Sequence, residues 1–362
     1  MRKNFLTTAV MLAMFLNSSI AQDSTKSITI SGSVDGYYRY NFANVNDGKS
    51  NNKTSFTNSQ NSFALGMASL RADATALSGK VTATADLGFG PRAEEFSYYE
   101  TATKSSLSFI KQMYVTYALS SKVKITAGKF ATHVGYEVMD APLNRNYSMS
   151  YMFTNGPFSH TGVKMDVTAG QFGFMAGLAN FIDETNSTTN VKTFIAQVSG
   201  GSKDGKLKAY LNYAGFFGST KGLNPLTLKS LSQLDLVVNA TVSSKFSLGF
   251  NATVQSRDQK VKSDNSIPDG SWKGAALYLN FDPSAAVGLT LRSEYIGDSK
   301  EIYYGTKNIF ANTLSLDYKV GPFILIPELR IESAHSAIYL KNDGTTPTSS
   351  TATVLLAAVY KF

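Results

Sequence analysis

Few residues of this 362-residue sequence could support covalent chemistry. The absence of cysteine excludes a thiolate nucleophile, a thiolate metal site and a disulfide framework. The three histidines are His133, His160 and His335. Ser159 precedes His160, but neighbours on a strand point to opposite faces, so the pair does not predict a catalytic dyad. We therefore expect no enzyme, no cofactor and no metal, and an outer-membrane hydrolase is the weakest alternative.

Charged residues of both signs instead recur on the polar faces of alternating segments. Charges that face water inside a wide barrel tune which ions pass. The candidate pore-lining residues are Asp35, Arg39, Lys124, Lys164, Asp166, Lys208, Arg292, Glu294, Glu328, Arg330 and Glu332. The densest part of this set, in the segments that contain Arg292 and Arg330, favours an ion-pair lattice over a binding site.

The segments that carry these charges alternate apolar and polar residues with the period of a β-strand. In the first, Ile28, Ile30 and Val34 share one face, and the segment runs for about thirteen residues to Tyr40. Strands of soluble sandwiches have about five or six residues, so this length favours a membrane-spanning strand. The other expected strands lie at about 61–76, 80–89, 106–118, 122–131, 158–169, 171–182, 191–200, 206–213, 233–242, 246–255, 277–281, 289–294, 313–319, 323–332 and 351–362.

The connections between these segments alternate in length. Seven short turns are expected at 77–80, 119–122, 170–171, 202–205, 243–245, 282–285 and 320–321. Eight long polar loops are expected at about 41–60, 90–105, 132–157, 183–190, 217–231, 256–273, 298–309 and 335–349. Regular alternation predicts an all-β fold: a single transmembrane antiparallel up-and-down β-barrel of about sixteen strands, with short periplasmic turns and long extracellular loops.

The two ends of the sequence agree with this topology. Residues 1–21 have a basic start, a short apolar core and small residues before Gln22, as a signal peptide does. We expect residues 22–362 to form the barrel. In 351–362 every second residue from Val354 to Phe362 is apolar. A barrel must pair its last strand with its first, because an open edge in lipid leaves backbone groups unsatisfied.

Composition fits alternating lipid-facing and water-facing residues. Charged residues make up 17% of the sequence, below the usual ~25%, and aromatic residues make up 12%. The mean hydropathy is near zero, at −0.10. The formal charge is +8, and removal of Arg2 and Lys3 with a signal peptide lowers it to +6. A mild positive charge suits an anion-tolerant lumen, whereas the lack of a compact Lys/Arg cluster argues against nucleic acid.

The longest loop, 132–157, is the third of the long loops. It contains His133, Glu137, Asp140 and Arg145. Two interpretations stay open: a constriction loop that folds into the lumen, by analogy with sixteen-stranded general diffusion porins, and an ordinary surface loop.

A family resemblance is visible around this loop. The segments are 128–137 (GKFATHVGYE), 144–148 (NRNYS) and 156–163 (GPFSHTGV), together with the first strand at 31–42 (SGSVDGYYRYNF). They resemble the OmpL-like β-barrel porins (family 2) of Bacteroidetes. The resemblance implies a channel-like protein of the bacterial outer membrane and carries over no catalytic residue.

The function expected from the sequence is passive diffusion of small hydrophilic solutes, with a mild preference for anions. A structural or adhesive barrel with a plugged lumen is the main alternative, and single-channel conductance separates the two. The expected partners are outer-membrane lipid, small hydrophilic solutes, the barrel-assembly machinery through the C-terminal strand 351–362, and further copies of the chain in a homotrimer.

Overall fold

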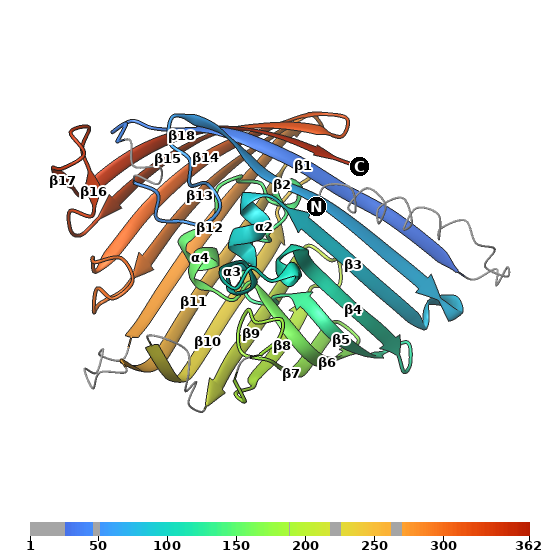
Figure 1. Cartoon of the computed structure of the whole chain (residues 1–362). Coiled ribbons are helices and arrows are strands. Elements are labelled where there is room, and N and C mark those ends of the chain that lie inside the picture. Colours follow the sequence, from blue (N-terminus) through green and yellow to red (C-terminus); the bar gives the residue numbers. More distant parts are fainter. Residues whose placement is uncertain (1–25, 46–50, 188, 218–225, 262–269) are drawn as a thin grey trace, which may run out of the picture.

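A computed structural model describes residues 26–45, 51–187, 189–217, 226–261 and 270–362. Within these residues sixteen strands close into one antiparallel barrel, in which each strand pairs with its sequence neighbours among the barrel strands (Figure 1). The strands are β1 (Ser27–Asn41), β2 (Ser62–Ala76), β3 (Val81–Phe89), β4 (Ile110–Ala118), β5 (Val123–Ala131), β6 (Ser159–Ala169), β7 (Phe172–Ala179), β8 (Thr193–Gly201), β9 (Leu207–Phe217), β10 (Leu226–Thr241), β11 (Phe246–Val261), β12 (Gly270–Ser284), β13 (Val287–Gly297), β14 (Asn308–Val320), β15 (Phe323–Ala334) and β18 (Ser350–Lys361). The predicted fold class and strand number are confirmed.

The barrel is closed by the first and last strands. β1 and β18 are antiparallel neighbours, with Val34 opposite Tyr360 and Tyr40 opposite Val354. Figure 1 shows this seam as the blue β1 beside the red β18. Pairing along the seam leaves no open sheet edge, as a strand barrel in lipid requires.

The two faces of the wall have opposite character. Outward side chains are apolar and exposed, for example Phe63 (87%), Leu65 (74%) and Leu356 (46%). Inward positions carry polar groups that are almost completely buried, such as Asp235 and Arg292. An apolar exterior around a polar interior is the arrangement of a membrane barrel, because acyl chains cover the first face and water or protein covers the second.

The short turns and long loops alternate as predicted, but the loops contain more structure than the sequence indicated. The second long loop contains the helices α2 (Pro91–Phe96) and α3 (Tyr98–Ala102) and the 3-10 helix η2 (Ser106–Phe109). The third contains the 3-10 helix η3 (Ala141–Leu143) and α4 (Tyr151–Asn155). The last contains the small ladder of β16 (Tyr339–Leu340) and β17 (Pro347–Thr348). No helix among the described residues is long and apolar enough to cross a membrane.

Several strand boundaries differ from the expected ones. β10, β11 and β12 extend well into the predicted loops 217–231 and 256–273, whereas β4 begins only at Ile110 and β7 ends at Ala179. In the extended part Gln255 pairs with Trp272 and Ser230 with Phe217. The backbone ladder continues here although the sequence alternation is less regular, because ladder hydrogen bonds join backbone groups and do not depend on the side chains. The predicted signal peptide 1–21 lies outside the described residues.

Candidate functional site

The third long loop, residues 132–158, runs through the lumen. Ser150 begins α4 by accepting a hydrogen bond at Oγ from the Phe153 amide at 3.1 Å. Tyr147, Met149 and Tyr151 have no exposed surface. Connecting loops normally run over the protein surface, so these side chains show that this loop forms part of the interior.

The loop is fastened to the wall across the lumen from its own strands. Buried carboxylates on that wall accept hydrogen bonds from loop amides and hydroxyls. The bonds are Gly135 N to Asp235 Oδ1 (2.9 Å), Tyr147 N to Glu328 Oε2 (3.0 Å), Tyr151 N to Glu294 Oε2 (2.7 Å) and Tyr151 Oη to Glu332 Oε1 (2.5 Å). Each bond satisfies a backbone or hydroxyl group that would otherwise be buried without a partner.

A chain of ion pairs lies behind these bonds. Glu137 of the loop contacts Arg292 at 2.6 Å, and Arg292 contacts Glu294 at 3.3 Å. Arg330 joins Glu294 (3.1 Å) to Glu332 (3.0 Å). All five side chains are buried. Breaking a buried ion pair leaves an uncompensated charge. This series of ion pairs therefore holds the loop against β13 and β15. Glu328 takes no part in these ion pairs and accepts hydrogen bonds instead.

The inward residues of β1 bind two different loops. Asp35 Oδ1 accepts a hydrogen bond from Tyr147 Oη at 2.6 Å. A Cβ atom at Gly66 on β2 would lie 2.5 Å from that hydroxyl, so a glycine is required for the contact. Arg39 Nη1 donates to Ser59 O of the first long loop at 3.0 Å. Both residues are buried, so they brace loops in this structure and present little surface to the lumen.

The loop is also bound on its near side. Lys111 of β4 contacts Asp140 at 2.5 Å and Asp86 at 3.0 Å. Arg92 of α2 is completely buried and donates to Tyr147 O at 3.3 Å. Its guanidinium carbon also lies 4.7 Å from the centre of the Tyr147 ring. The second long loop therefore packs against the third and helps to hold it in place.

The start and the middle of the loop make further contacts. His133 Nε2 lies 2.9 Å from Tyr213 O, and burial lowers the pKa of the imidazole below its usual value. Arg145 contacts Asp282 at 2.5 Å and donates to Thr290 Oγ1 at 2.8 Å. With Glu137 and Asp140, all four residues predicted for a constriction loop bind the wall or a neighbouring loop.

Four predicted pore-lining residues occupy less crowded positions. Lys164 and Asp166 on β6 are half-buried and form an ion pair at 3.2 Å. Lys124 on β5 and Lys208 on β9 are exposed. Lys124, Lys164 and Asp166 line the same cavity, but Lys208 does not.

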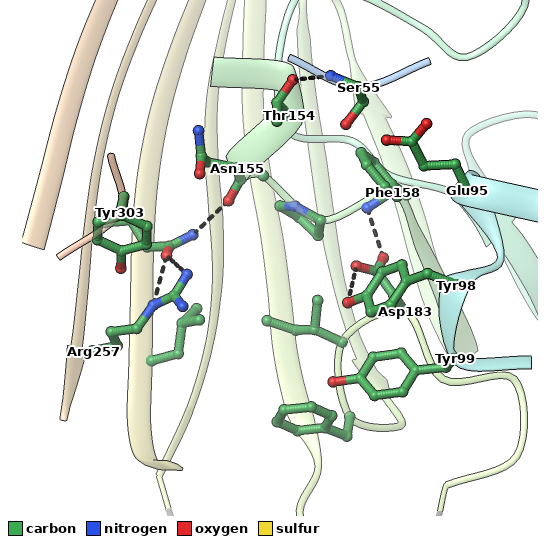
Figure 2. A pocket seen from close by; sticks show the side chains of 16 residues that line it. Ser55, Glu95, Tyr98, Tyr99, Thr154, Asn155, Phe158, Asp183, Arg257 and Tyr303 are labelled. Carbon is green, nitrogen blue, oxygen red and sulfur yellow. Dashed lines mark hydrogen bonds between the residues drawn. The ribbon is translucent and has the colours of Figure 1, made fainter. Parts of the chain in front are cut away.

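Two of the larger cavities lie toward opposite ends of the barrel. The cavity at the short-turn end, of about 650 Å³, is lined by β2–β6 and includes Lys122, Lys124 and Lys164. The cavity at the long-loop end, of about 460 Å³, lies between the second loop and β11 (Figure 2). No cluster of three or more His, Asp and Glu side chains suited to a metal ion occurs in the described part of the chain.

Several residues that organise this interior are absent from the predicted site residues. Lys111 and Arg92 hold the third loop, and Asp183 accepts hydrogen bonds from the Phe158 and Ser159 amides at 2.6 and 2.8 Å. Lys111 occupies an inward position of a predicted strand, which was an available signal. Asp183 lies in a polar loop, where nothing in the local pattern distinguishes a buried carboxylate.

Comparisons with known proteins agree with this architecture. The outer-membrane channel DcaP of Acinetobacter baumannii has a TM-score of 0.64 and 14% identity, with 94% of this chain and 98% of that chain covered. The anion-selective porin from Comamonas acidovorans has a TM-score of 0.57 and 12% identity, with 93% and 100% covered. The trimer form of OmpT from Vibrio cholerae has a TM-score of 0.57 and 13% identity, also with 93% and 100% covered. These similarities support the fold. No match was found among curated proteins.

A family model identifies the chain more specifically. The model described as "Putative beta-barrel porin-2, OmpL-like" matches residues 27–362, which include every barrel strand. The chain therefore belongs to the OmpL-like beta-barrel porin-2 family, and it is a porin-like channel protein of the bacterial outer membrane.

Proposed function

We propose that this channel allows passive diffusion of small hydrophilic solutes and that its third loop is the constriction. The supporting observation is a loop bound by hydrogen bonds inside a closed barrel, with a cavity toward each end. Solutes would reach the cavity lined by β2–β6 by passing the third loop, which is bound by Glu294 and Glu328 on one side and by Lys111 of β4 on the other.

The proposed preference for anions follows from unbalanced charge in the cavity at the short-turn end. Its two aspartates are neutralised nearby, Asp166 by Lys164 and Asp73 by Arg71 at 2.7 Å. Lys122 and Lys124 line the same cavity without a carboxylate in ion-pair range among the described residues. A net positive wall raises the local concentration of anions.

Reversal potentials in planar bilayers test this proposal. Lys122→Glu with Lys124→Glu should shift the reversal potential in a salt gradient toward cation preference. Lys203→Glu with Lys206→Glu makes the same change in charge in the turn between β8 and β9 and should leave the potential unchanged. An unaltered potential in the double variant would exclude this wall as the selectivity element.

A plugged barrel is the second candidate, and the complete burial of Tyr147, Met149 and Tyr151 favours it. A plug predicts silent bilayers for the natural protein and steady currents for a chain that lacks residues 134–156. A diffusion channel predicts steady currents for both, with the larger conductance in the deletion variant.

We also propose that the protein performs no covalent chemistry. Within the interior His160 Nε2 lies 3.3 Å from Thr132 Oγ1 and the ring lies beside His133, an arrangement that suits packing better than catalysis. Purified barrel that released fatty acids from phospholipid vesicles, or cleaved peptide, would refute this.

Three further elements of the expected biology complete the proposal. Residues 1–21 direct export and 22–362 form the barrel, which N-terminal sequencing of the outer-membrane form would test. Strand 351–362 presents its apolar row to the assembly machinery, so removal of Phe362 should reduce insertion. A homotrimer is the proposed assembly, supported by the similarity to a trimeric porin, and chemical cross-linking in the membrane tests it.

A further inference from the structure

The cavity at the long-loop end has two walls of different charge (Figure 2). One wall contains Gln255 and Arg257 of β11 and Tyr303 of the loop between β13 and β14. The facing wall contains Glu95 of α2 and Tyr99 of α3. The volume of about 460 Å³ lies within the range of roughly 300–1,000 Å³ that is usual for small-ligand sites.

The cationic wall is held in place but not neutralised. Arg257 Nη2 and Nε donate to Gln255 Oε1 at 2.6 and 3.2 Å, and Gln255 Nε2 donates to Asn155 O at 3.2 Å. The Arg257 guanidinium lies 4.8 Å from the centre of the Tyr303 ring. No carboxylate of the described residues is in ion-pair range of Arg257, and the buried Tyr303 hydroxyl has no hydrogen-bond partner among them. The Arg257 guanidinium and the Tyr303 hydroxyl are therefore left as donors for an anionic group.

The facing wall presents a carboxylate. Glu95 Oε2 accepts hydrogen bonds from the Phe56 amide at 2.9 Å and from Asn58 Nδ2 at 2.8 Å. Both bonds are to the same oxygen, which leaves Oε1 without a partner in the part of the chain that the structure describes. Fixed in this way, Glu95 can bind a cationic group at little cost in side-chain entropy.

An apolar lining separates the two charges. Tyr98 and Tyr99 lie with ring centres 4.5 Å apart, and Phe158 and Phe181 complete the aromatic surface. The buried Asp183 positions this surface, because its Oδ1 accepts from the Phe158 amide and its Oδ2 accepts from Tyr98 Oη at 3.2 Å. The lining offers contact area to an apolar side chain.

We propose that this cavity binds a small zwitterion with an apolar side chain, of the class of dipeptides, with its carboxylate at Arg257 and Tyr303 and its ammonium group at Glu95. An anion would pair with Arg257 but would also approach the Glu95 carboxylate. A cation would pair with Glu95 but would also approach the Arg257 guanidinium. A zwitterion pairs with both, and charge-assisted bonds are the stronger ones. The inference deepens the proposed diffusion function by naming the solute class, and binding itself does not require an open route.

Isothermal titration calorimetry on the purified barrel in detergent tests the site. The probe is alanyl-phenylalanine, compared with N-acetyl-phenylalanine as the anion, phenylalanine amide as the cation and glucose as a neutral solute. The dipeptide should bind at least tenfold more tightly than the other three. Arg257→Gln and Glu95→Gln should each weaken dipeptide binding at least tenfold. Glu95→Gln should leave the acetylated anion unimpaired, and Lys206→Gln in the turn between β8 and β9, outside both cavities, is the matched control.

Three outcomes would overturn the proposal: equal binding of all four probes, tighter binding of glucose, or unchanged dipeptide affinity in both variants. Tyr303→Phe removes one hydroxyl only and should weaken the dipeptide about threefold, so it tests the site if a charge variant does not fold. Dipeptide binding by a barrel that carries no current would refute the channel but support the site. Current without dipeptide binding would refute the site alone.

Discussion

The two sides of the lumen use charge in different ways. On the anchored wall, the inward faces of β12–β15 and β1, buried charged residues such as Glu294 and Glu328 bind the third loop, and Arg39 binds the first. On the open wall, meaning only those positions of β2–β6 that line the short-turn cavity, Lys122 and Lys124 are exposed and have no carboxylate partner among the described residues. A lumen charge can therefore organise the interior or face solutes, and burial distinguishes the two roles.

The largest expected difference between the walls is in stability. Arg292→Ala removes a buried cation that contacts Glu137 and Glu294, and such losses cost about 3–5 kcal/mol because the remaining charges are uncompensated. Lys124→Ala on the open wall should change the free energy of unfolding by less than about 0.5 kcal/mol. Denaturant unfolding can be followed through Trp272, the single tryptophan, which packs in the same buried cluster as Tyr151. Equal destabilisation by the two variants would remove the distinction between the walls.

A pH-dependent effect is expected beyond β7, in the loop that contains Asp183. Burial raises the pKa of Asp183 to about 6 from its ordinary 3.8, so the folded state favours the protonated form. The contribution of Asp183 to the free energy of unfolding is therefore complete below about pH 4 and is lost as the pH rises through 6. The shift in pKa corresponds to a loss on the order of 3 kcal/mol. Hydrogen exchange of the Phe158 amide, corrected for its intrinsic rate, should show faster opening at pH 7 than at pH 4.

The last long loop provides the control for this pH dependence. Hydrogen bonds from Thr346 hold the pKa of Asp343 at about 2, so protection of the Thr346 amide should not change between pH 4 and 7. Asp183→Asn should abolish the dependence at Phe158. A dependence that persists in this variant would assign the effect to another group.

A smaller difference should separate two tyrosine hydroxyls. Tyr147→Phe deletes the 2.6 Å hydrogen bond to buried Asp35 and should cost about 1–3 kcal/mol, because the buried carboxylate keeps only the Met67 amide as a donor at Oδ1. Tyr114→Phe on the open wall deletes only a 3.4 Å contact with Arg71 and should cost less than about 0.5 kcal/mol. Unfolding midpoints of the two variants give the comparison, and a reversed order would contradict it.

The smallest difference between the walls is expected for partly exposed ion pairs. Arg145→Ala and Lys164→Ala each delete one such pair, with Asp282 and Asp166 respectively. Pairs of this kind contribute about 0.2–1 kcal/mol. Both variants should therefore unfold within about 1 kcal/mol of the natural protein, and a loss above 2 kcal/mol in Arg145→Ala would show that the pair anchors the loop.

Much of the barrel could be predicted because strand signals are local. The alternation in 351–362 and in 28–40 was read from adjacent residues, and the structure pairs these two segments. The exact strand ends are harder to predict from the sequence. β11 continues to Val261, because backbone pairing does not require an apolar face.

The sequence by itself determined the closed sixteen-strand barrel, its alternating connections and its apolar exterior, because a period of two and turn residues act over a few positions. Only the tertiary structure decided that the third loop lies in the lumen, that Arg292 and Arg330 anchor it, and that Lys124 faces a cavity. These outcomes depend on contacts such as Tyr151 with Glu332, separated by 181 residues. Contacts of that range form only when the barrel closes and brings distant strands around one interior.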